Sequence, residues 1–241
     1  EWRTWDRAVW IRVVAAGSFL AVHFATWITS LSYTSVANSV VLVNTAPVWV
    51  GLLAPVLTHD RPSRRLWGGI ALCCIGSVLI GWKGISEGGG TRAGDALAVA
   101  GGMAAAVYLL MGRSVRDRVS TLGYVTVCYG SAAVWLWGAV LVRGLPAAGF
   151  TASTWWALIG LALVSQHLGH SSYNWCLKHL SAALLAVTLL GEPVLSSLWA
   201  FLLFGEGLSA LQAVGGMIIL IGIYRAATIP AGTGPLAETS P

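Results

Sequence analysis

Charged residues are scarce in this chain. Asp, Glu, Lys and Arg make up 10% of its 241 residues, whereas a soluble domain carries about 25%. Hydrophobic residues make up 56%, and the mean hydropathy is +0.75. These values exclude an ordinary soluble domain and indicate an integral membrane protein. Because the apolar runs are long, instead of short and alternating, we predict an all-α bundle and not a membrane β-barrel.

The sequence also lacks the motifs of several enzyme classes. It has no G-x-x-x-x-G-K-[ST] loop, which excludes ATP hydrolysis by that route. Its four cysteines lie within apolar runs and have neither metal-ligand spacing nor the pattern of a secreted disulfide framework. His167 and His170 form an H-x-x-H pair without a third ligand nearby. We therefore predict that the protein is not an enzyme and that it binds no metal ion and no cofactor.

Eight apolar segments are present, and about 20 helical residues suffice to cross the hydrocarbon core of a bilayer. The segments are Val9 to Ser30, Val36 to Leu57, Leu66 to Trp82, Gly94 to Gly112, Val119 to Val142, Thr154 to Leu177, Ser181 to Phe204 and Leu208 to Ala226. The sequence thus predicts a polytopic bundle with eight transmembrane helices. The tail from Ile229 to Pro241, rich in proline and glycine, is predicted to be disordered.

Basic residues gather in alternate loops. If every segment crosses the bilayer, 11 of the 14 Lys and Arg lie on one side, which the positive-inside rule assigns to the cytoplasm. This distribution explains the formal charge of +5 without a nucleic-acid partner. We expect a multi-pass protein of the inner or plasma membrane, embedded in the lipid bilayer, with a cytoplasmic C-terminus.

The chain contains an internal repeat. Shifted by 146 positions, the first part matches the last part without a gap, and Pro47 coincides with Pro193. Further coinciding pairs are Ser35 with Ser181, Ser63 with Ser209, Gly69 with Gly215, and Gly76 with Gly222. Five crossings, an odd number, separate each helix from its counterpart. The two copies are therefore predicted to have opposite orientations in the membrane, as in the inverted-topology repeats of secondary transporters.

The repeat divides the chain unequally. The first three segments correspond to the last three, whereas the fourth and fifth have no counterpart in the first half. We predict a partial first repeat of three helices (1–82), an extracytoplasmic loop (83–93), a second repeat of five helices (94–228) and a disordered cytoplasmic tail (229–241). By this reasoning, two further helices would precede Glu1.

The sequence resembles the EamA branch of the drug/metabolite transporter superfamily. The matching stretches are SLSYTSVANSVVLVNTAPVWVGLLAPVL and GGIALCCIGSVLIGW in the first half, and LKHLSAALLAVTLLGEPVLSSLWAFLLFGEGLSALQAVGGMIILIGIY in the second. The resemblance implies ten transmembrane helices in two inverted five-helix repeats, cytoplasmic termini, and export of amino acids or other small metabolites. This chain departs from the pattern by lacking the first two helices and by having Asp60 where such families often have Glu.

Polar residues inside the apolar segments are the candidates for substrate or proton binding. Glu192 is the foremost, because an ionised group in the bilayer core costs at least about 2.5–3.5 kcal/mol. The other candidates are His170, His167, Asn174, Thr188, His23 and Asn44. At helical spacing, Ser181, Thr188, Glu192 and Ser196 would form one polar stripe. Each smaller group fits equally well a hydrogen bond between helices.

Glu192 and its neighbour Pro193 suggest two roles. Glu192 is hypothesised to exchange protons or to bind a substrate's amino group, with His170 or His167 as its partner; a structural acid is the alternative. Pro47 and Pro193 lack a backbone N–H, so they are predicted to kink their helices, either as hinges or to shape the bundle. Since Ala46 stands where the second repeat has Glu192, the charge belongs to the second repeat alone.

These features predict a secondary-active transporter that exports amino acids or other small metabolites by alternating access. Its partners would be a small-molecule substrate and, if transport is coupled to a proton gradient, protons. A homodimer is compatible with the sequence. The alternative reading is an inactive fragment or a membrane partner protein that does not transport.

Overall fold

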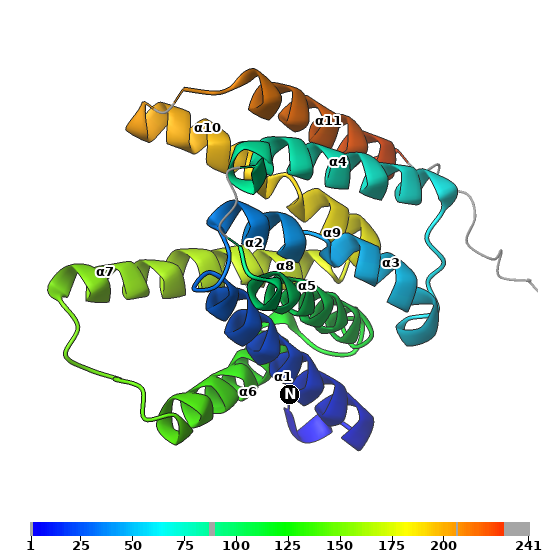
Figure 1. Cartoon of the computed structure of the whole chain (residues 1–241). Coiled ribbons are helices and arrows are strands. Elements are labelled where there is room, and N and C mark those ends of the chain that lie inside the picture. The colour runs from blue at the N-terminus through cyan, green and yellow to red at the C-terminus, as the bar shows by residue number, and fades with distance from the viewer. Residues whose placement is uncertain (1, 87–89, 206, 229–241) are drawn as a thin grey trace, which may run out of the picture.

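The computed structural model describes residues 2–86, 90–205 and 207–228, and these residues form helices and connections without a β-strand (Figure 1). The expected disordered tail, 229–241, lies outside the described residues. The helices are η1 (Trp2–Thr4), α1 (Arg7–Ser30), α2 (Val36–Val43), α3 (Ala46–Leu57), α4 (Arg64–Ser86), α5 (Arg92–Arg113), α6 (Thr121–Val142), α7 (Ala152–Gly160), η2 (Leu161–His170), α8 (Ser171–Cys176), α9 (Ala182–Leu189), α10 (Glu192–Phe204) and α11 (Ala210–Ala227).

Seven stretches of the described chain are long and apolar enough to cross a membrane. Five are the single helices α1, α4, α5, α6 and α11, and two are the pairs α2–α3 and α9–α10. The predicted helical membrane bundle is therefore confirmed. The remaining expected segment is present as α7, η2 and α8, which follow one another end to end, and the middle piece, η2, is a π-helix (Figure 1).

The two paired spans are broken, not merely kinked. The first is interrupted at Asn44 and Thr45, and the second at Leu190 and Gly191. Pro47 is the second residue of α3, and Pro193 is the second residue of α10. In the first turn of a helix the backbone N–H groups form no hydrogen bond within the helix, so a proline there removes none. Each helix ends before its proline and a new helix starts, so the predicted kink sites coincide with interruptions of the two spans. The proposed polar stripe is interrupted for the same reason.

The helix ends recur with the 146-residue shift seen in the sequence. α2 begins and ends 146 positions before α9, α3 begins 146 positions before α10, and α4 begins 146 positions before α11. The caps recur as well, since the side chains of Ser35 and Ser181 accept hydrogen bonds from the N–H groups of Asn38 and Leu184. Equivalent sequence signals therefore start and stop equivalent helices.

Helices α4 and α11 pack side by side and antiparallel (Figure 1). Gly69 faces the carbonyl oxygen of Gly222, and Gly76 faces that of Gly215. Between these contacts, the Cys73 Sγ lies 3.5 Å from the Ile219 carbonyl oxygen. The repeat shift maps Gly69 onto Gly215 and Gly76 onto Gly222, so it exchanges the two glycine contacts. Such an exchange in an antiparallel pair is the arrangement that an inverted repeat requires.

Helix α5 lies in the middle of the bundle, in contact with α1, α2, α3 and α9. Small residues on its buried face allow this close packing, and they include Ala98, Gly101, Gly102 and Ala106. At the start of α1, the Asp6 carboxylate accepts a hydrogen bond from the Val9 N–H and pairs with Arg118. The hydrogen bond from Arg118 lowers the pKa of Asp6. It also ties the start of α1 to the connection between α5 and α6.

We predict that Gly76→Ala lowers the free energy of unfolding by about 1–3 kcal/mol, because an added methyl group in a tightly packed site forces neighbouring atoms to move. A methyl group there would lie 2.5 Å from the Gly215 carbonyl oxygen. The measurement is thermal unfolding in detergent, followed by circular dichroism. The control is Gly130→Ala in α6, where an added methyl group meets nothing within 4 Å. Equal unfolding midpoints for the two variants would contradict the glycine contact.

The two equivalent helices α3 and α10 are followed by residues in the same unusual conformation. His59 has φ 61° and its counterpart Gly205 has φ 67°. A left-handed backbone is free of strain for glycine but not for histidine. We predict that His59→Gly raises the free energy of unfolding by about 1 kcal/mol. The same substitution at His179, which is not left-handed, is the control and should bring no gain. An unfolding midpoint for His59→Gly at or below that of the parent would refute the strain.

Candidate functional site

Aromatic and imidazole rings from α1, α5 and the η2–α8 stretch form a cluster inside the bundle. His23 is buried against α5, with Nδ1 3.0 Å from the Gly101 carbonyl oxygen. The Phe24 ring lies 5.0 Å from the His23 ring and 5.4 Å from the His170 ring. Two candidates from corresponding segments of the two repeats, His23 and His170, thus both lie close to the ring of one phenylalanine.

His170 and His167 have different neighbours. The His170 ring lies 6.4 Å from Tyr108 on α5 and 5.3 Å from Tyr173, whereas the exposed His167 lies 6.4 Å from Tyr129 on α6. The sequence placed both histidines on one α-helical face. Both lie in the π-helix η2, which has more residues per turn and thus rotates them relative to one another. π-helical turns within helices occur frequently at functional sites.

Asn174 links three helices. Its Nδ2 lies 2.7 Å from the Tyr108 hydroxyl, 3.0 Å from the Tyr129 hydroxyl and 2.9 Å from the His170 carbonyl oxygen. The residue is fully buried, and its Oδ1 has no hydrogen-bond partner among the residues that the structure describes. A buried carbonyl oxygen without a partner is rare, so this atom is an unsatisfied acceptor within the cluster.

Glu192 is the first residue of α10, not the middle of a continuous helix, and it is exposed. Its carboxylate interacts electrostatically with Tyr173, which contacts His170. In the described residues it forms no ion pair with His167 or His170, the two partners proposed from the sequence. The carboxylate is therefore within electrostatic range of Tyr173, at the edge of the ring cluster.

Two candidates do not join the cluster. Asn44 ends α2, where its backbone N–H donates to the Val40 carbonyl oxygen at 3.0 Å. The exposed Thr188 donates its hydroxyl to the Leu184 carbonyl oxygen at 2.9 Å, one turn back in α9. Pro47 and Pro193 lie at the two helix breaks and are both buried.

Three tyrosines surround the histidines and were not predicted as site residues: Tyr108, Tyr129 and Tyr173. A signal was present, because tyrosine is enriched at the membrane interface and these three lie inside apolar segments. A G-x-S-x-G string at 84–88, which has the spacing of a serine-hydrolase elbow, was likewise not predicted as a site. Ser86 is the last residue of α4, however, and its hydroxyl donates to the Lys83 carbonyl oxygen. The strand-to-helix turn that the elbow requires does not precede it.

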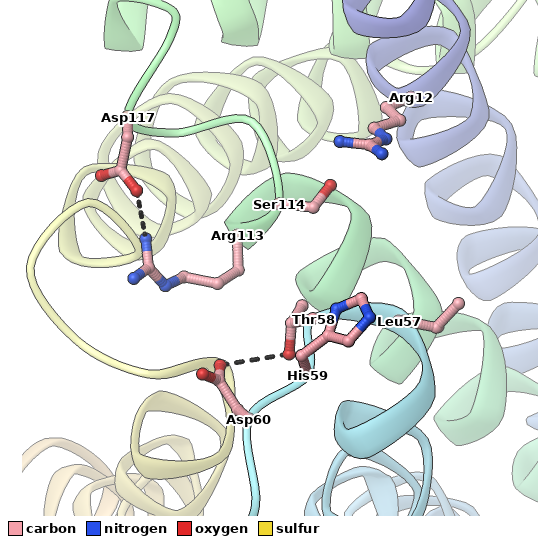
Figure 2. A pocket seen from close by; sticks show the side chains of 8 residues that line it. All are labelled: Arg12, Leu57, Thr58, His59, Asp60, Arg113, Ser114 and Asp117. Carbon is pink, nitrogen blue, oxygen red and sulfur yellow. Dashed lines mark hydrogen bonds and ion pairs between the residues drawn. The ribbon is translucent and has the colours of Figure 1, made fainter. Parts of the chain in front are cut away.

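A pocket of about 250 Å³ lies where α3 and α5 end and α1 begins (Figure 2). It is lined by Arg12, Leu57, Thr58, His59, Asp60, Arg113, Ser114 and Asp117. Asp60 accepts a hydrogen bond from Thr58 at 3.1 Å, and Arg113 pairs with Asp117 at 3.3 Å. Its lining shares no residue with the ring cluster.

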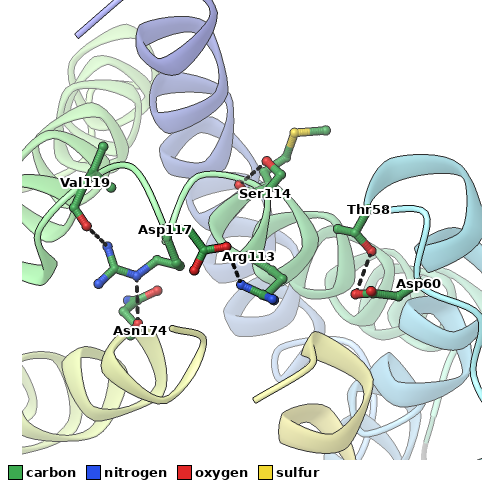
Figure 3. A network of polar contacts seen from close by, with 9 residues as sticks. Thr58, Asp60, Arg113, Ser114, Asp117, Val119 and Asn174 are labelled. Atoms are coloured by element: carbon green, nitrogen blue, oxygen red, sulfur yellow. Dashed lines mark hydrogen bonds and ion pairs between the residues drawn. The ribbon is translucent and has the colours of Figure 1, made fainter. Parts of the chain in front are cut away.

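Arg116 lies in the basic connection between α5 and α6. The side chain is fully buried and donates to the carbonyl oxygens of Asn174, Val119 and Ser120 at 3.0, 3.4 and 3.1 Å. Figure 3 shows Val119 and Asn174 meeting at this guanidinium. The Tyr124 ring lies 5.2 Å from it. The arginine thus fastens the α5–α6 connection to the helix that carries Asn174.

Within the described chain, no group of three or more His, Cys, Asp or Glu lies close enough together to hold a metal ion. The fold and the buried polar cluster define the class: this is a polytopic helical membrane protein with broken spans. Comparison of the sequence with known families names it more closely. The EamA-like transporter family matches residues 1–82 and 92–228, and the chain belongs to this family.

Relatives and solved structures agree with this membership. An "Uncharacterized transporter" of Archaeoglobus fulgidus is 26% identical over 92% of this chain and 80% of its own length. The "Uncharacterized transporter YyaM" of Bacillus subtilis is 23% identical over 90% of this chain and 71% of its own length. A solved crystal structure has a TM-score of 0.75 over 93% of this chain and 77% of that chain, at 20% identity. That similarity supports the fold.

We predict that Asn174→Leu lowers the free energy of unfolding by about 1–2 kcal/mol, because the buried Tyr108 hydroxyl and the half-buried Tyr129 hydroxyl lose a partner. Thermal unfolding in detergent measures the loss. Ser172→Ala is the matched control, since Ser172 is exposed and, in the described part of the chain, its hydroxyl bonds only to the Leu168 carbonyl oxygen. If Asn174→Leu unfolds at the same midpoint as the control, the network around Asn174 does not stabilise the bundle.

Proposed function

We propose that this protein is a secondary-active transporter that exports amino acids or other small polar metabolites by alternating access. The observation that carries the proposal is the pair of broken spans, which recur at equivalent places in both repeats. Discontinuous helices at a repeat interface typically build the substrate site of such transporters. Family membership supports transport, whereas the substrate class, the direction and the mechanism are our proposal.

The ring cluster is the proposed central binding site. Asn174 Oδ1 would accept a hydrogen bond from a substrate's amino group, and the rings of His23 and His170 would form the walls. Glu192, at the start of α10, would bind the same amino group or carry a proton. Thr188, Asn44 and His167 would contribute only in another conformation, because they lie outside the cluster or at its edge.

The helix breaks are the proposed hinges. A break leaves the two half-helices joined by a few residues whose φ and ψ angles can change without disrupting an intact helix. Pro47 and Pro193 fix the start of each second half and keep it from merging with the first. Rocking of α3 and α10 about these breaks would open the site to each side in turn.

The distribution of Lys and Arg indicates the orientation of the protein in the membrane. We propose a cell membrane location with a cytoplasmic C-terminus, because 11 of the 14 basic residues lie on that side if each segment crosses. The driving force would be a proton or substrate gradient, and a homodimer is a further proposal. A membrane partner without transport activity is the competing function, and it predicts no flux.

The test is export from proteoliposomes loaded with radiolabelled amino acids, with and without a proton gradient. We predict that Glu192→Gln lowers the export rate about tenfold and removes its pH dependence, because one charge-assisted interaction is lost. Thr188→Val is the control and should export at the parent rate, since its hydroxyl bonds only to its own helix.

Two results would count against the proposal in different ways. Glu192→Gln with an unchanged rate and pH dependence would exclude this acid from the mechanism while leaving transport in place. No flux of any loaded amino acid in the parent protein would favour the competing function.

A further inference from the structure

The pocket at the ends of α1, α3 and α5 has charges of both signs and no role in the central cluster (Figure 2). It lies at the end of the bundle that carries Arg61, Arg64 and Arg65, the end predicted to face the cytoplasm. An exported molecule would meet this end first. The pocket is therefore placed where a substrate would be captured before it reaches the ring cluster.

The charges in the pocket are only partly neutralised by one another. Arg113 is paired with Asp117, but Arg12 forms no ion pair or hydrogen bond with its side chain in the described part of the chain. Asp60 accepts a hydrogen bond through Oδ2 from the neutral hydroxyl of Thr58. One guanidinium and one carboxylate thus remain without a charged partner of their own. The pocket lining thus offers one group that can bind a negative charge and one that can bind a positive charge.

His59 contributes a second, independent observation. It holds a left-handed backbone at φ 61°, although the equivalent position of the other repeat has glycine. Strain that persists where a glycine would relieve it is characteristic of functional positions. The side chain of His59 lines the pocket, between the positions of Asp60 and Leu57 (Figure 2). The strained residue therefore supplies a pocket wall that the equivalent glycine cannot.

We propose that this pocket binds a small zwitterion with one carboxylate and one ammonium group, the chemistry of an amino acid. The Arg12 guanidinium binds the carboxylate, and the Asp60 carboxylate binds the ammonium group. The His59 ring closes the wall beside them. The inference rests on the proposed export function for its physiological meaning, since it assigns the pocket as the cytoplasmic entry site for the same substrate.

The experiment must report on this pocket alone, because a transported amino acid would also bind the central cluster. Ser114→Cys in the full chain places a thiol in the pocket lining, and its rate of modification by a maleimide is measured in detergent. The unsubstituted chain gives the background from the native cysteines. The probes are L-alanine, propionate and ethylamine, which carry both charges, the negative charge and the positive charge, respectively.

We expect L-alanine to slow the modification at lower concentrations than propionate or ethylamine. In the Ser114→Cys background, Arg12→Gln and Asp60→Asn should each raise the half-protecting concentration of L-alanine about tenfold or more. Arg7→Gln, a charge removal on the same helix outside the pocket lining, should leave it unchanged. Unfolding midpoints equal to that of the Ser114→Cys chain show that the variants are folded.

Three results would overturn the inference: no protection by L-alanine, protection by propionate equal to that by L-alanine, or protection that Arg12→Gln and Asp60→Asn leave intact. Flux of L-alanine in proteoliposomes separates this inference from the proposed function. Flux without protection refutes the pocket and leaves transport standing. Protection that depends on Arg12 and Asp60 without flux supports the binding site and refutes transport of this amino acid.

Discussion

The close contact of α4 with α11 is the constraint on which the arrangement of the two repeats depends. In a bilayer, lipid tails are as apolar as leucine side chains, so helices associate through tight packing and not through the hydrophobic effect. Gly69 with Gly222 and Gly76 with Gly215 bring the backbones together at two points that the repeat exchanges. A side chain at one glycine contact would push α4 and α11 apart there. It would also disturb the other contact, because both lie between the same two helices.

Broken helices create a second demand, since the backbone groups freed at each break must find partners in an environment without bulk water. At the first break, the Thr45 hydroxyl donates to the Leu42 carbonyl oxygen and accepts from the Trp49 indole N–H. Gly102 of α5 lies against the Val43 carbonyl oxygen and shields it from lipid. The central position of α5 and its small residues thus stabilise the interruption between α2 and α3.

The sequence predicted those features that depend on neighbouring residues in the chain, and not those that depend on how the helices pack. Serine caps, apolar run lengths and the repeated proline gave the fold class, and the repeat shift agrees to the residue with the starts of three helix pairs and with the ends of α2 and α9. The π-helix around His167 and His170 could not be read, because the residues of η2 also suit an α-helix. The burial of Arg116 was equally hard to predict, since it donates to three carbonyl oxygens, which every sequence contains, besides the Thr121 hydroxyl. Candidate residues that depended on helix rotation were therefore the ones misplaced.

The two repeats share a scaffold but differ in chemistry. Equivalent helices start with Ala46 in α3 and Glu192 in α10, and equivalent left-handed positions hold His59 and Gly205. A scaffold alone requires neither Glu192 nor His59, since alanine and glycine perform the same structural task in the other copy. Each repeat thus carries one costly residue that its counterpart does without. These differences, and not the shared prolines, are where selection for a particular substrate would act.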